Sequence, residues 1–140
     1  MMPKWHILAS TTLAVVIFTI TNSFTAAVAC FISGTVIDID HVFDYYLYCG
    51  RLSLDISEIS GFYQHYGKVI VVLHSYELLF VAVIVTFIFH VHVLFIGVAI
   101  GFVGHMLMDT FAYEMKPQSY FLLYRIRNGF KIEKLCNQKQ

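Results

Sequence analysis

Residues 34–46 read GTVIDIDHVFDYY and place four ionisable side chains within seven positions, directly after about thirty mostly apolar residues. The four are Asp38, Asp40, His41 and Asp44. An ionised side chain at bilayer depth is costly, so such groups are expected to pair, to face a wet cavity or to bind a metal. The stretch therefore predicts a polar site at one end of an apolar helical protein.

The composition is that of a membrane protein. Hydrophobic residues make up 59% of the 140 positions, the formal net charge is zero, and the mean hydropathy is +0.72. Ordinary soluble domains are less apolar. The neutral charge balance gives no indication of a nucleic-acid partner. The three cysteines form no C-x-x-C pair, so free thiols are expected rather than a disulfide framework.

The apolar segments predict an all-α integral membrane protein with about four transmembrane helices in one domain, residues 1–140. A single helix over the first apolar stretch would be about 46 Å long, beyond a hydrocarbon core of about 30 Å. Since Thr21-Asn22-Ser23 interrupts this stretch, we expect two helices. The predicted spans are approximately 6–21, 24–40, 69–91 and 93–113, with a loop at 45–68 and a tail at 117–140.

An alternative for the first segment is a secretory signal, because Ala27-Val28-Ala29-Cys30 resembles a cleavage or lipoprotein acylation site. The apolar stretch before it is long and interrupted, and the Leu that usually precedes an acylation site is missing. Membrane spans are therefore favoured.

The basic residues indicate the orientation of the spans. Four spans put both termini, the long loop and all nine Lys and Arg on one side, which the positive-inside rule makes the cytoplasm. Residues 120–135, YFLLYRIRNGFKIEKL, mix apolar and basic side chains. This pattern is typical of an interfacial amphipathic segment against anionic lipid, and a plain basic tail is the alternative.

Residues far apart in the chain are expected to meet at the depth of the Asp38–Asp44 cluster. His74 and Glu77 are spaced i,i+3 near the start of the third span. His105 and Asp109 are spaced i,i+4 near the end of the fourth, so each pair is expected to share a helix face. His6 begins the first span on the same side. The alternative is that these buried polar groups bind no metal and only hold the helices in register through hydrogen bonds between them.

Imidazole and carboxylate together favour zinc, iron or manganese, and no cysteine is placed for a thiolate zinc site. The expected ligands are His74, His105 and Asp109 together with Asp40 or His41. A metal there would activate water, and Glu77 or Asp38 would take the proton. The role of Asp44 is left open, because a regular helix points Asp38 and His41 in a different direction from Asp40 and Asp44.

The motifs TVIDIDHVFDYY, LHSYELL and GHMLMDT, preceded by MMPKWH, resemble inner-membrane proteins of bacteria and archaea known as membrane-bound metal-dependent hydrolases. More distantly they are similar to zinc-dependent phospholipase C-like proteins. The resemblance covers about residues 1–130. It implies the following metal ligands, with Asp38 beside them: His6, Asp40, His41, His74, His105 and Asp109. The chain departs from the family where Ile37 replaces a common proline.

The leading hypothesis is a metal-dependent hydrolase of the cytoplasmic membrane that binds zinc, or else manganese or iron. It would act at the inner leaflet on an ester or phosphoester of a small molecule or a membrane lipid. A metal or proton translocator is a second hypothesis, which the apolar outer half of the spans disfavours. A non-enzymatic membrane scaffold that uses the basic tail is a third.

Overall fold

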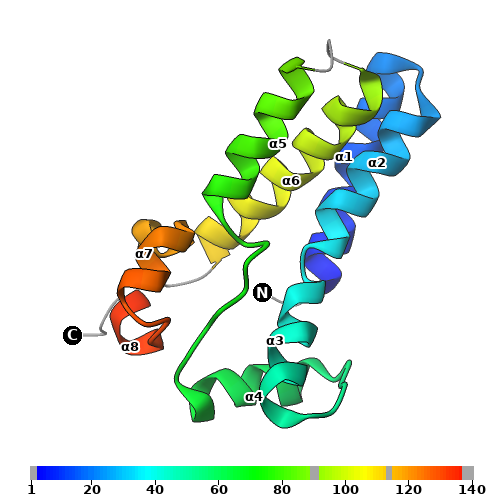
Figure 1. The fold of residues 1–140 in the computed structure, drawn as a ribbon. Coiled ribbons are helices and arrows are strands. Elements are labelled where there is room, and N and C mark those ends of the chain that lie inside the picture. Colours follow the sequence, from blue (N-terminus) through cyan, green and yellow to red (C-terminus); the bar gives the residue numbers. More distant parts are fainter. Residues whose placement is uncertain (1–2, 89–91, 113–114, 137–140) are drawn as a thin grey trace. The chain divides into compact units, whose positions relative to one another are not determined.

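The computed structural model describes residues 3–88, 92–112 and 115–136 (Figure 1). Within these ranges the chain is helical and has no strand, and isolated β-bridges join Lys68 to Lys131 and Met115 to Cys136. The predicted all-α class is confirmed. Parts of the predicted spans and tail, at 89–91, 113 and 137–140, lie outside the described residues.

The contacts within the chain define two compact units. Unit 1 comprises Met1–Ile37 and Glu77–Tyr113, and unit 2 comprises Asp38–Tyr76 and Glu114–Gln140. Each unit therefore joins an earlier segment of the chain to a later one. That residues 1–140 form one membrane-embedded domain stays a prediction.

Unit 1 contains four of the described helices (Figure 1). They are α1 (Pro3–Thr21), α2 (Phe24–Val36), α5 (Tyr76–Ile88) and α6 (Val93–Ala112). The expected break after Thr21 is present: Asn22 adopts a left-handed φ of 50°. The Ser23 side chain then caps α2 by accepting the amide of Ala26 at 3.2 Å. The sequence signal at Asn22 thus divides the first apolar stretch into two helices, as predicted.

Among the described helices of unit 1, α2 and α6 make the most extensive contact, and α1 packs on both. Glycines allow this approach. A Cβ atom at Gly97 would collide with the carbonyl group of Ala26, and one at Gly101 would collide with Cys30 and Ser33. Small residues four positions apart are a common way for membrane helices to bring their backbones together. The small side chains therefore fix the distance between α2 and α6.

Unit 2 contains α3 (Ile39–Cys49), α4 (Ile56–Tyr66), a 3-10 turn η1 (Pro117–Tyr120), α7 (Leu122–Arg127) and α8 (Ile132–Leu135). Between α4 and α5 the chain is extended, and Val69 and Val71 form a buried cluster with Leu135. The tail thus contributes to the interior of unit 2. Leu123 and Ile126 of α7 are exposed, and the interfacial location of the tail stays a prediction.

Within the described residues, three helical stretches are long and apolar enough to cross a membrane, which indicates a membrane protein. They are Lys4–Thr21, Phe24–Cys49 and Val93–Ala112. The expected third span differs, because its helix begins at Tyr76 and not near Val69. The described part of α5 has 13 residues. His74 precedes the helix, so the expectation that His74 and Glu77 share a helix face is wrong.

The break that follows α2 lies at Ile37 and Asp38, and α3 begins at Ile39. Gly34, three residues before Ile37, is not part of this break. Instead Gly34 is a buried residue of the last turn of α2, where a Cβ atom would meet the Ser10 hydroxyl and the Gly101 carbonyl. Its role in the fold is close packing of α2 against α1 and α6.

Candidate metal centres

Unit 1 brings together two imidazoles and one carboxylate at the end where α1 begins and α6 ends. The donor atoms of His6, His105 and Asp109 all lie within 4.8 Å of one another. His6 Nε2 is 3.2 Å from Asp109 Oδ1, and His105 Nε2 is 3.3 Å from Asp109 Oδ2. The imidazole rings stack with their centroids 4.3 Å apart. We call these three residues the buried group, because their side chains are at most 4% exposed.

The helices position the buried group. His105 and Asp109 are one turn apart on α6 and therefore share a face, as predicted from their spacing. His6 lies in the first turns of α1. The carbonyl of Gly34 lies 2.9 Å from Nδ1 of His105. Carbonyls in the last turn of a helix lack amide partners from their own helix, so this one can accept from the imidazole.

The contact with Gly34 fixes the proton on His105. A carbonyl oxygen can only accept a hydrogen bond, so Nδ1 of His105 carries a proton. In the neutral ring, Nε2 then presents a lone pair towards Asp109 Oδ2, 3.3 Å away. Two acceptors face each other at this distance, and a shared cation would bind to both. An imidazole oriented by a backbone carbonyl is a common arrangement for a metal ligand.

Unit 2 brings together a second set of the same composition. The donor atoms of Asp38, His41 and His74 lie within 4.8 Å of one another. His74 Nε2 is 3.5 Å from Asp38 Oδ1, and the centroids of the two imidazole rings are 4.6 Å apart. The Asp38 side chain is 29% exposed and His41 is half-buried. We call these three residues the accessible group.

Neighbouring polar groups orient both imidazoles of the accessible group. Asp40 Oδ1 lies 3.0 Å from Nδ1 of His74, which favours a proton on Nδ1 and leaves Nε2 as the donor nitrogen. The Tyr63 hydroxyl lies 2.9 Å from Nδ1 of His41. Burial, followed by the charges of Asp44 and Asp40, raises the pKa of Tyr63. Tyr63 therefore keeps its proton at neutral pH.

The backbone that carries His74 is held by side chains from α3 and α7. The amide of Ile70 donates to Asp44 Oδ2 at 3.1 Å, and the amide of Leu73 donates to Asp40 Oδ2 at 2.7 Å. Arg125 of α7 donates to carbonyls of the same segment. These bonds explain why the apolar residues before His74 are not helical.

The structure places the expected site residues in two groups, one in each unit. His6, His105 and Asp109 form one group, and His41 and His74 belong to the other. We expected Asp40 to bind the metal and Asp38 to act as the base. In the structure Asp38 is among the donors, whereas Asp40 contacts the far side of the His74 ring. Glu77, in the first turn of α5, belongs to neither group of described donors. That all these residues form a single site stays a prediction.

Sequence analysis missed the role of Arg125, which looked like one of several basic residues of the tail. It is 1% exposed. Its only sequence signal is its place in a mixed apolar and basic stretch, which does not distinguish it from Arg127. The contact of Tyr63 with His41 likewise had no signal in the spacing.

Comparisons with protein families, with curated proteins and with solved structures find no match for this chain. The functional argument therefore depends on the geometry of the two donor groups. Each could hold a divalent metal ion, because imidazole nitrogens and a carboxylate are ligands that zinc, iron and manganese all accept.

Proposed function

We propose that this protein is a membrane-bound metal-dependent hydrolase and that its reaction takes place at the accessible group. The observation that supports this best is the convergence of Asp38, His41 and His74, with the ring of His74 oriented by Asp40. Three protein ligands leave a position open for water, which is the arrangement of catalytic zinc sites. The partial exposure of Asp38 would give water and substrate access to that position.

A bound zinc ion would lower the pKa of a water ligand to about 7 and polarise the bond that is attacked. The residues of the chain have separate roles in this proposal. His41 and His74 would provide ring nitrogens, with Tyr63 and Asp40 in contact with their Nδ1 atoms. Asp38 contributes the negative charge. The proton of the attacking water would pass to a carboxylate, for which Asp38 of the same group is the candidate.

The buried group would hold a second metal ion that links α1 to α6. His6 and Asp109 come from these two helices, and the Gly34 contact of His105 adds α2. The near-complete burial of all three side chains leaves little room for a substrate. We therefore assign this metal a structural role in unit 1.

The membrane location suggests the class of substrate. Three apolar helical stretches support residence in a bilayer, and the distribution of Lys and Arg supports an inner membrane with both termini in the cytoplasm. We propose an ester or phosphoester substrate, carried by a lipid or a small molecule. The resemblance to membrane-bound metal-dependent hydrolases supports the same class of reaction.

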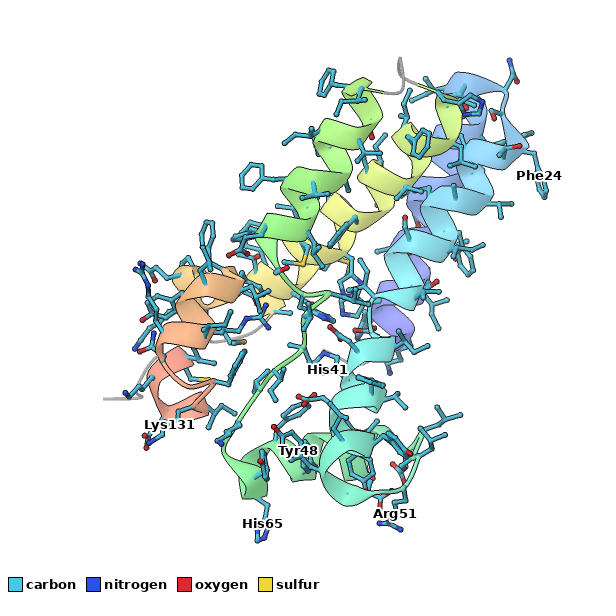
Figure 2. All side chains as sticks on the ribbon, in the orientation of Figure 1. Phe24, His41, Tyr48, Arg51, His65 and Lys131 are labelled. Atoms are coloured by element: carbon cyan, nitrogen blue, oxygen red, sulfur yellow. The ribbon has the colours of Figure 1, made fainter. Side chains whose placement is uncertain are left out.

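The test uses the full chain purified in detergent, with its metal removed by a chelator and replaced by zinc. Hydrolysis of bis(p-nitrophenyl) phosphate, p-nitrophenyl esters and phospholipid in mixed micelles is measured. We expect zinc-dependent turnover that falls by more than about 100-fold in His74→Ala and His41→Ala, since even indirect contacts to a metal are worth 10- to 100-fold. His65→Ala is the matched control, because His65 is exposed and points away from α4 (Figure 2). A protein that takes up no zinc, or that hydrolyses none of these compounds, would refute the proposal.

A further inference from the structure

Arg125 is one of the most deeply buried large side chains of the protein, although it comes from a stretch rich in basic residues. Its residue exposure is 1%. Nη1 donates to the carbonyl of Ile70 at 3.1 Å and also to that of Val71, and Nη2 donates to the carbonyl of His74 at 2.9 Å. The guanidinium therefore connects both ends of the extended segment that carries His74.

The same segment is held along its other polar edge by carboxylates. Asp44 accepts the amide of Ile70, and Asp40 accepts the amide of Leu73. Anionic acceptors thus bind the amides, and a cationic donor binds the carbonyls. The residues are not in a helix or sheet, so these side-chain bonds replace the backbone ladder that would otherwise fix the segment.

The position of the His74 ring depends on this support. Asp40 orients the ring through Nδ1, but the ring can reach the other donors only if its own backbone is in place. Arg125 binds the carbonyl of His74 itself, two residues before α5 begins at Tyr76. A planar guanidinium can span carbonyls at both ends of a short segment, whereas a lysine ammonium is a point charge on a flexible chain.

We propose that Arg125 is a positioning residue for the accessible group: it holds the backbone of residues 70–74 so that His74 presents Nε2 to a metal ion. The inference depends on the metal that the proposed function assigns to Asp38, His41 and His74. It does not depend on which reaction the metal serves.

The experiment measures cobalt(II) binding to full-length protein in detergent, with one donor group removed at a time. In the His105→Ala background the metal that still binds is expected at the accessible group, so the measured affinity is that of this group. Here we expect Arg125→Met to weaken cobalt binding by 10- to 100-fold and to change its visible absorption spectrum. Arg125→Lys should bind with intermediate affinity, since it keeps the charge but not the planar fork. Arg127→Met is the control, because Arg127 is an exposed residue of the same helix, and it should bind as the parent does.

In the His74→Ala background the metal reports the buried group, and Arg125→Met should leave its affinity unchanged. Equal weakening in both backgrounds would mean that Arg125 only maintains the fold, and unchanged binding in the His105→Ala background would mean that it positions nothing. Either result overturns the inference. Cobalt binding that follows these expectations without any hydrolysis would refute the proposed function alone, and a wild-type protein without metal would refute both.

Discussion

Replacing Asp40 tests whether the carboxylate beside His74 orients a metal ligand. Asp40 is 8% exposed and has two contacts: Oδ2 accepts the amide of Leu73 at 2.7 Å, and Oδ1 lies 3.0 Å from Nδ1 of His74. Asp40→Asn has almost the same shape, but it has one oxygen and no negative charge. If that oxygen accepts the amide of Leu73, the NH₂ group faces Nδ1 of His74.

The size of the effect follows from these contacts. A hydrogen bond to a charged group contributes about 1.5–3 kcal/mol, so Asp40→Asn should lower the free energy of unfolding of unit 2 by about that amount. Loss of a carboxylate behind a ligating histidine typically weakens metal binding by 10- to 100-fold, or about 1.4–2.8 kcal/mol. We expect both losses, because one side chain serves both the backbone of the segment and the ring of His74.

Zinc competition with a chromophoric chelator, in the His105→Ala background, measures the affinity of the accessible group. Asp44→Asn is the matched control. Asp44 lies one turn later on α3 and accepts the amide of Ile70 in the same segment, and its side chain interacts with the Tyr63 hydroxyl rather than with an imidazole. Its amide oxygen can still accept that hydrogen bond, so zinc affinity should change by less than about threefold. The reasoning would be refuted if Asp44→Asn weakened zinc binding while Asp40→Asn bound zinc like the parent.

Further changes test the packing, the hydroxyl near His41 and the cap of α4. Gly101→Leu forces α2 away from α6 and should destabilise the protein by about 1–3 kcal/mol or more, measured by unfolding in mixed detergent micelles. Tyr63→Phe removes the hydroxyl at Nδ1 of His41 and should weaken zinc binding by up to about 10-fold in the competition assay. Hydrogen bonds from Ser57 lower the pKa of Asp55, so its capping contribution is present above the ordinary pKa and is lost as the pH falls through the lowered one. Circular dichroism between pH 6 and 2 should therefore show a loss of helix at the acid end in the wild type that is smaller in Asp55→Asn, because an asparagine cap does not titrate.

The parts of the fold that sequence predicts are those with a local cause. Asn22 and Ser23 interrupt an apolar stretch too long for one helix, and the structure has a left-handed residue and a helix cap there. The four-residue spacing of His105 and Asp109 places both on one face of α6. In each case the residues that produce the structure are neighbours in the chain, so the local sequence pattern is sufficient to predict it.

The segment at Val69–Leu73 shows why other parts could not be predicted. Its apolar residues look like the start of a membrane span, although β-branched side chains also favour an extended backbone. Its conformation is fixed by hydrogen bonds to Asp40, Asp44 and Arg125, which are 26 to 55 positions away in the sequence. No periodicity in the sequence of the segment predicts these hydrogen-bond partners. The start of α5 was therefore placed too early.

The same distant contacts give the acidic residues of the Asp38–Asp44 cluster different roles. Helical geometry predicts that Asp38 and His41 point one way and that Asp40 and Asp44 point another. Spacing alone does not say which pair faces the other donors, because that depends on where the chain returns at residues 69–74. Once Asp40 and Asp44 are bound to the amides of that segment, His74 follows Leu73 directly and arrives beside His41. The carboxylates that hold the backbone thus determine which carboxylate remains beside the imidazoles, and this leaves Asp38 in the donor group.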